Sequence, residues 1–206
     1  PRVLAKLRQA GCLYISYGCE SGNEEILKKI NKGITLQQVR NAVKWTNEAG
    51  IANSVNFIIG HRDETFQTAM DSVNFARSLP ASFLVFYNLV PYPGTGAFLW
   101  VNRHGKFLVD TNNYMEAISY VDNKPIFETK EFTREERLKI TELGFSIHEY
   151  SNSFHRSGAL AGAWNSGPGL AAMGRHAAPQ YVFAGERPSG SLRARQIQEG
   201  HRGRRH

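Results

Sequence analysis

The chain has 206 residues, of which 41% are apolar and 21% are charged, proportions that are ordinary for a soluble protein of one domain with or without an appendage. No apolar run approaches the roughly 18 residues that a membrane-spanning helix needs, and no basic-then-apolar segment predicts secretion. Two cysteines exclude a disulfide framework and fit a reducing compartment. We therefore expect a cytoplasmic protein with no membrane partner.

The net charge of +7 is concentrated at one end of the chain. Residues 1–150 carry a net charge of +1, whereas residues 151–206 carry eight Arg, no Lys and two Glu, a net charge of +6. The near-neutral first part does not favour nucleic acid as a partner. The Gly-, Ala- and Arg-rich end shows no strand or helix period, which predicts a disordered tail. It is either a basic arm that touches nucleic acid or, the reading we favour, a non-native end.

Helical spacing opens the sequence. Leu4, Leu7 and Ala10 recur on one helix face, and Gly11 ends the predicted helix. Residues 13–17 predict a buried strand. Because the chain begins at Pro1 and enters this helix at once, we expect it to be a fragment.

Two capping-box spacings follow. Ser21 with Glu24 predicts the start of a short helix, and Thr35 with Gln38 predicts the start of a longer one that Gly50 ends. Each predicted helix is therefore preceded by a defined turn.

The same alternation continues. A strand is predicted at residues 54–59, then a helix that Asp63 or Thr65 caps and Pro80 stops, then a strand at residues 83–90. Continuous apolar strands between helices predict an α/β fold with a parallel sheet buried on both faces. Three strands form either part of an open doubly wound sheet or part of a (β/α) barrel, and both architectures bind ligands at the carboxyl ends of their strands.

This rule singles out three loops, each with a structural alternative. In the loop at residues 18–22, Glu20 can accept hydrogen bonds from ribose hydroxyls or an ammonium group, or it and Ser21 can simply cap the next helix. In the loop at residues 60–65, Gly60 lets a flat base approach the backbone, while Glu64 alone is better explained as a helix cap. The loop at residues 91–96 is a pocket wall or a plain turn. His61 has no partner at metal-ligand spacing, and no metal ligand is assigned in this chain.

The three loops together resemble those of radical S-adenosylmethionine (SAM) enzymes, most closely members with an N-terminal cobalamin-binding domain. The matching runs keep the family's order: residues 10–23, 32–35, 56–65, 91–95, 125–129 and 133–138. The resemblance implies the C-terminal part of a partial TIM-like (β/α) barrel. It also implies a [4Fe–4S] cluster that reduces SAM to a 5′-deoxyadenosyl radical, which abstracts hydrogen from a substrate.

By this resemblance the cofactor-binding positions come from all three loops: Gly18, Glu20, Ser21, Gly22, Ile58, Gly60, Glu64, Pro91, Tyr92 and Pro93. Glu20 and Ser21 are expected beside the ribose and methionine, and Ile58 and Gly60 beside adenine. The sequence does not identify the substrate, which is a small molecule or a macromolecule, or the catalytic residues.

The sequence departs from the family in two places. The cluster motif C-x-x-x-C-x-x-C is absent, and His61-Arg62-Asp63 replaces the usual Pro-Gly turn. We therefore expect residues 1–110 to be the C-terminal part of the barrel core, residues 111–150 a helical extension and residues 151–206 the tail. The chain alone is expected to be inactive. The alternatives are a non-catalytic remnant, or a fragment of an RNA-modifying enzyme whose basic tail grips phosphates.

Overall fold

A computed structural model describes residues 1–117 and 123–157, with side chains placed for residues 1–115 and 123–147. The predicted tail at residues 151–206 lies almost wholly outside this part. The elements run in the order α1 (Arg2–Gln9), β1 (Tyr14–Glu20), α2 (Glu24–Lys29), α3 (Leu36–Glu48), β2 (Ala52–Ile59), α4 (Phe66–Arg77), β3 (Phe83–Asn88), α5 (Gly96–His104), β4 (Gly105–Phe107), α6 (Tyr114–Ala117), β5 (Phe127–Thr129) and α7 (Arg134–Ser157). None of the helices in these ranges has both the length and the apolar character to cross a bilayer.

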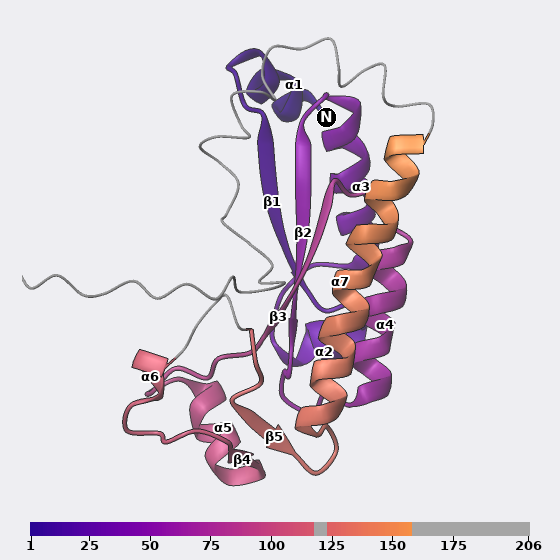
Figure 1. Cartoon of the computed structure of the whole chain (residues 1–206). Coiled ribbons are helices and arrows are strands. Elements are labelled where there is room, and N and C mark those ends of the chain that lie inside the picture. Colours follow the sequence, from indigo (N-terminus) through magenta and orange to yellow (C-terminus); the bar gives the residue numbers. More distant parts are fainter. Residues whose placement is uncertain (118–122, 158–206) are drawn as a thin grey trace, which may run out of the picture. The chain divides into compact units, whose positions relative to one another are not determined.

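The three long strands form one parallel sheet in the order β1-β2-β3, as predicted. In the register Gly18 lies opposite Asn56, and Ile58 lies opposite Tyr87. The register shifts between Gly18 and Glu20, where β1 ends. Each strand is linked to the next through at least one helix (Figure 1). The strands therefore all point the same way, and their carboxyl ends share one edge.

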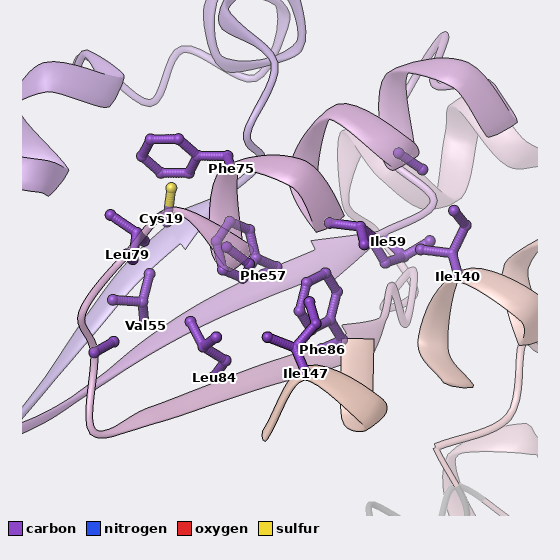
Figure 2. Packing of buried hydrophobic residues seen from close by; sticks show 14 of the residues in the cluster. Cys19, Val55, Phe57, Ile59, Phe75, Leu79, Leu84, Phe86, Ile140 and Ile147 are labelled. Carbon is purple, nitrogen blue, oxygen red and sulfur yellow. The ribbon is translucent and has the colours of Figure 1, made fainter. Parts of the chain in front are cut away.

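One face of the sheet carries the main hydrophobic core. Helices α3, α4 and α7 lie on that face (Figure 1), and the core side chains come from all three strands and all three helices (Figure 2). The rings of Phe57 and Phe86 stack 4.8 Å apart at its centre. Gly144 lets α7 pack on this pair, because a Cβ at that position would overlap the Phe86 ring. The long helix α7 thus belongs to the core of the sheet.

The opposite face, called the open face below, is only partly covered in the described part of the chain: on β2 Ser54 is buried and Asn56 and Ile58 are half-buried, so the prediction of two buried faces fails mainly at β1. Ser16 is exposed at the middle of β1, and exposed and half-buried residues alternate from Tyr14 to Gly18, before the buried Cys19. Polar side chains bridge the strands there: Ser54 Oγ lies 2.9 Å and Asn56 Nδ2 2.8 Å from Ser16 Oγ. Apolar residues predominate in each strand, but Ser16, Ser54 and Asn56 alternate with them. Their polar side chains therefore all lie on one face of the sheet.

The helix starts follow the predicted capping chemistry in two of three cases. Thr35 caps α3 in a reciprocal box with Gln38, as predicted, and Thr65 rather than Asp63 caps α4. The prediction that Ser21 starts a helix was wrong. Asn23 caps α2, because its side-chain oxygen accepts hydrogen bonds from the backbone N–H groups of Glu25 and Ile26 at 3.0 and 3.1 Å.

Residues after β3 add a small antiparallel pair that the sequence did not predict. Gly105 in β4 pairs with Thr129 in β5, and Phe107 pairs with Phe127. Strands of three residues give no readable period, so only the structure reveals them. The predicted domain boundaries at residues 110 and 150 stay predictions.

Val43→Ala should lower the free energy of unfolding by about 2 kcal/mol, because it removes two buried methyl groups and leaves a cavity. Val43 is fully buried between α3 and the sheet. Urea unfolding measures the change, with the exposed neighbour Lys44→Ala as the control. Equal midpoints for the two variants would contradict this assignment of the core.

Candidate functional site

An ion pair marks the carboxyl end of β1. The Lys32 ammonium donates to Glu20 Oε1 at 2.8 Å, and both side chains are partly exposed. Glu20 has a backbone φ of +72°, a left-handed conformation that is unusual outside glycine. Gly18 lies beside the pair, since a Cβ there would fall 2.5 Å from Glu20 Oε1 and 3.2 Å from Lys32 Nζ. The strand thus ends in a small cradle that presents one charge of each sign.

Lys32 was missed as a site residue by the sequence reasoning. Its backbone N–H donates to Leu27 O at 3.0 Å, which closes the end of α2, and Gly33 with a φ of +69° follows it. This turn sends the side chain back to β1, twelve residues earlier. The sequence shows Lys32 and Gly33 after a short helix, but it does not show that the Lys32 side chain pairs with Glu20.

Ser21 and Gly22, which were predicted to be cofactor-binding, are both buried against α4. Ser21 Oγ accepts from Asn23 N–H at 3.1 Å, and Gly22 N–H donates to Ser72 Oγ at 2.8 Å. A Cβ on Gly22 would lie 2.6 Å from Ser72 Cα, so only glycine lets the loop approach the helix this closely. The contacts of Gly22 with Ser72 attach the loop to α4. This attachment supports the neighbouring cradle at Gly18 and Glu20.

The loop after β2 is organised by the buried carboxylate of Glu64, which is 3% exposed. Its Oε2 accepts from the backbone N–H groups of Gly60 at 2.5 Å and His61 at 3.2 Å. Gly60 has a φ of +104°, and a Cβ on it would lie 2.5 Å from Arg137 Nη1 of α7. The prediction of a helix cap was wrong for Glu64: its carboxylate closes the preceding loop, and Thr65 caps the helix.

Burial dominates the electrostatics of this loop. It raises the pKa of Glu64 to about 7, against the opposing effect of the Gly60 and His61 amides and of Arg137. It lowers the pKa of His61 to about 4, against the opposing effect of the Glu20 carboxylate and a hydrogen bond to the Glu20 backbone. It also lowers the pKa of Arg137 to about 10. His61 thus connects the ends of β1 and β2 in its neutral form.

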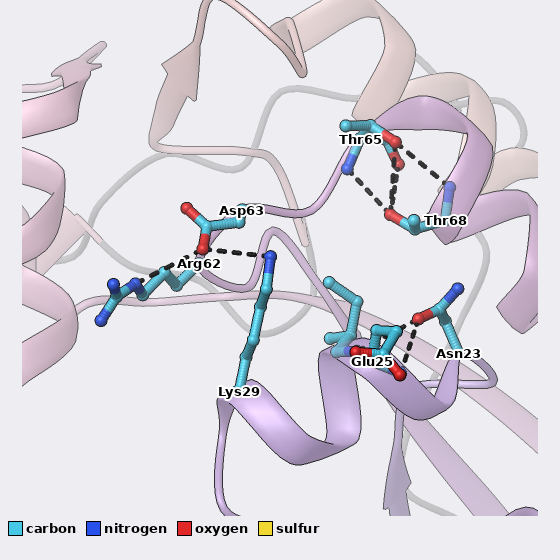
Figure 3. A network of polar contacts seen from close by, with 8 residues as sticks. Asn23, Glu25, Lys29, Arg62, Asp63, Thr65 and Thr68 are labelled. Atoms are coloured by element: carbon cyan, nitrogen blue, oxygen red, sulfur yellow. Dashed lines mark hydrogen bonds and ion pairs between the residues drawn. The ribbon is translucent and has the colours of Figure 1, made fainter.

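The outer side of the same loop is tied to α2. Lys29 Nζ lies 3.2 Å from Asp63 Oδ2, and Arg62 Nε lies 3.5 Å from the same atom (Figure 3). These groups are 42% to 64% exposed, so each pair adds little stability. These ion pairs orient the loop at residues 61–63, which stands where the family that the sequence resembles usually has a Pro-Gly turn.

The third loop forms a turn. Pro91 is buried, and its carbonyl accepts from the Tyr114 hydroxyl. The Tyr92 carbonyl accepts from the backbone N–H and the hydroxyl of Thr95 at 3.1 and 2.6 Å. Tyr92 and Pro93 are exposed. The plain-turn alternative describes these contacts, and the cofactor role predicted for Pro91, Tyr92 and Pro93 stays a prediction.

Comparison with known proteins identifies the class of this fold and site. Residues 1–76 match the radical SAM superfamily. An uncharacterized methyltransferase of Pyrococcus horikoshii is 34% identical over 139 residues, which are 68% of this chain and 29% of that protein. The bacteriochlorophyllide d C-12(1)-methyltransferase of Chlorobaculum tepidum is 34% identical over 99 residues, which are 48% of this chain and 22% of that protein.

The fold comparison agrees. Coproporphyrinogen III oxidase (HemN) from Escherichia coli, a radical SAM enzyme, matches 72% of this chain and 29% of its own length, with a TM-score of 0.50 and 15% identity. The chain therefore belongs to the radical SAM superfamily in the part that these matches cover. It spans less than a third of the length of these relatives.

The two cofactors of the superfamily fit this chain differently. Cys12 precedes β1 and Cys19 lies within it near its carboxyl end, and burial raises the pKa of the Cys19 thiol to about 12, so this pair does not fit a cluster that needs thiolates. Among the described residues no three His, Cys, Asp or Glu side chains are grouped to hold a metal ion. SAM fits better, because its ammonium and carboxylate match the charge pair of Glu20 and Lys32.

Glu64→Gln should change how stability depends on pH. The folded chain keeps the Glu64 proton up to about pH 7, whereas the unfolded chain loses it near pH 4.5. The stability from this group is therefore complete below pH 4.5 and is lost as the pH rises through 7, by about 3 kcal/mol in total.

Urea unfolding of both proteins between pH 5 and 8 measures the difference. His61 titrates in both, so the difference between the two curves isolates Glu64. The exposed Glu142→Gln on α7 is the control and should follow the parent chain. Parallel curves for Glu64→Gln and the parent chain would contradict the raised pKa.

Proposed function

We propose that this chain supplies the SAM-binding edge of a radical SAM enzyme. The observation that carries the proposal is the charge pair of Glu20 and Lys32, 2.8 Å apart at the carboxyl end of β1. It stands beside Gly18 and on the sheet face that no helix covers in the described residues. The carboxyl edge of parallel strands is where barrels and open α/β sheets bind ligands.

Different residues contact different parts of the SAM molecule in this proposal. Glu20 accepts hydrogen bonds from the ammonium or the ribose hydroxyls of SAM, and Lys32 pairs with its carboxylate. Ile58, half-buried on the open face, and the backbone of Gly60 offer an apolar surface to adenine. Glu64 acts indirectly by fixing the turn. Ser21 and Gly22 support the first loop from behind.

The proposal concerns binding. When bound, SAM supplies the 5′-deoxyadenosyl group with which the superfamily abstracts hydrogen. The ligands of the [4Fe–4S] cluster are not among the residues of this chain, and no step through the cluster is assigned to it. We take the chain to be the C-terminal half of the barrel of a longer cytoplasmic enzyme. Sequencing the gene upstream of Pro1 tests this, since an open frame encoding C-x-x-x-C-x-x-C is expected there.

We infer methyl transfer as the reaction class of the longer enzyme. The support is that two relatives, each 34% identical, are named methyltransferases. Cobalamin as a second cofactor rests on the sequence resemblance. The substrate, a small molecule or a macromolecule, stays open.

A non-catalytic remnant is the alternative that the missing cluster ligands favour. A stop codon or an unrelated gene upstream of Pro1 would support it. A fragment of an RNA-modifying enzyme is the other alternative. RNA affinity that is unchanged by deleting residues 151–206 would remove it.

Glu20→Ala should weaken SAM binding by about 1–3 kcal/mol, the value of a lost charge-assisted hydrogen bond. Lys32→Met should weaken it similarly, because it removes the other half of the pair. Calorimetry on the chain, or on the longer gene product if the upstream frame is open, measures both. Glu25→Ala is the control, since Glu25 forms an exposed pair with Lys28 on α2. Affinities equal to that of the control would remove Glu20 and Lys32 from the site.

A further inference from the structure

The side chain of Arg137 reaches the end of β2 from a helix that begins far along the chain. Arg137 lies in the first turn of α7, 77 positions after Gly60, and is 1% exposed. Its guanidinium carbon lies 4.0 Å from the ring centroid of Phe127 and 5.0 Å from that of Phe132. Its Nε donates to Phe132 O at 3.3 Å. The segment from β5 to α7 therefore fixes this cation in one orientation.

The opposite side of the guanidinium faces the loop after β2. Arg137 Nη1 is buried without a hydrogen-bond partner among the described residues, and it lies where a Cβ of Gly60 would be. Glu64 Oε1 is also buried and unpartnered, while Oε2 accepts from the Gly60 and His61 amides. A buried cation and a buried carboxylate thus flank the same backbone turn.

The other charged groups around the pair are few. Glu128 of β5 favours the charged form of Arg137, and His61, which is neutral, is influenced by Glu20 and Lys32 at the end of β1 and by Arg137. Glu64 and Glu128 together favour the charged form of Arg137, and Arg137 favours the charged form of Glu64. In the described part of the chain, Arg137 is the charged group that acts on Glu64.

We propose that Arg137 is a positioning residue for the cofactor-binding turn: it favours the ionised form of the Glu64 carboxylate and so holds the Gly60–Glu64 loop in shape. The inference rests on the proposed function, in which this turn receives adenine. Arg137 acts through the turn, because its Nη1 lies 2.5 Å from the position that a Cβ of Gly60 would take. The segment containing β5 and α7 therefore completes the cofactor site although it follows the strands that form it.

The physical reason is the preference of a buried carboxyl group for its neutral form. Hydrogen bonds from amides to a carboxylate are stronger than those to a neutral acid, so protonation loosens the turn. An opposite charge within about 4–6 Å lowers a carboxyl pKa by roughly one to three units. With Arg137 in place the pKa of Glu64 is about 7, so loss of Arg137 should raise this pKa further and leave the group mostly neutral at physiological pH.

The first test follows the backbone amides of Gly60 and His61 by NMR as the pH is changed in the full chain. Both amides donate to Glu64, so their shifts report its ionisation. In Arg137→Met the titration midpoint should rise by about one unit or more. In Lys139→Met, the control on the same helix whose ammonium lies 5.4 Å from the Phe66 ring centroid, it should not move. An unmoved midpoint in Arg137→Met, or an equal shift in the control, would overturn the proposal.

A double variant keeps the proposal falsifiable if Arg137→Met does not fold. Removing both charges with Glu64→Gln and Arg137→Met should restore folding, because a buried pair tolerates joint replacement better than loss of one partner. A double variant that also fails to fold would assign Arg137 a packing role and overturn the proposal.

The cofactor is the last readout. If the parent chain binds SAM, Arg137→Met should weaken binding about tenfold or more near pH 7.5, and should add nothing further in the Glu64→Gln background. Equal losses in both backgrounds would overturn the proposal. If the parent chain binds no SAM, the proposed function fails, while the amide titration still decides the role of Arg137.

Discussion

Parallel pairing of three strands is the constraint on which the rest of this molecule depends. Since β1, β2 and β3 run in the same direction, each connection must return through a helix, and the carboxyl ends must share one edge. The helices cover one face, where the Phe57–Phe86 stack anchors the core. The other face keeps its polar residues and stays open in the described part of the chain. This geometry brings the loops after β1 and β2, from which the proposed site is built, to one edge of the sheet.

Buried ionisable side chains, as well as loops, form the edge of the sheet at the carboxyl ends of the strands. Glu64, His61 and Arg137 are all removed from water, and burial shifts the pKa of each toward its neutral form. Isolated charges of this kind destabilise a fold, so their presence at one strand end needs a reason beyond stability. The proposed role of the Gly60–Glu64 turn, which keeps a defined backbone shape beside the cofactor, would supply that reason. In contrast, the Glu20–Lys32 pair keeps partial access to solvent, which suits groups that exchange partners when a ligand binds.

Membership of the radical SAM superfamily fits this division between a sheet edge and its support. The matched part contains the two loops that the structure assembles at the edge, around Glu20 and around Gly60. The loop after β3 folds instead into a hydrogen-bonded turn held by Thr95 and Tyr114. The chain spans under a third of the length of its matched relatives.

The sequence by itself determined the helices and strands up to β3 and the direction of the three long strands, because apolar periodicity and local caps such as Thr35 with Gln38 are short-range signals. It also identified Glu20, Gly60 and Glu64 as strand-end residues. It failed where two signals looked alike: Ser21 has the spacing of a cap, but Asn23 makes the bonds. Only the tertiary structure decided that Lys32 turns back to Glu20, that one sheet face stays open, and that Arg137 reaches Gly60. These contacts join residues up to 77 positions apart, and their geometry depends on how the helices pack on the sheet.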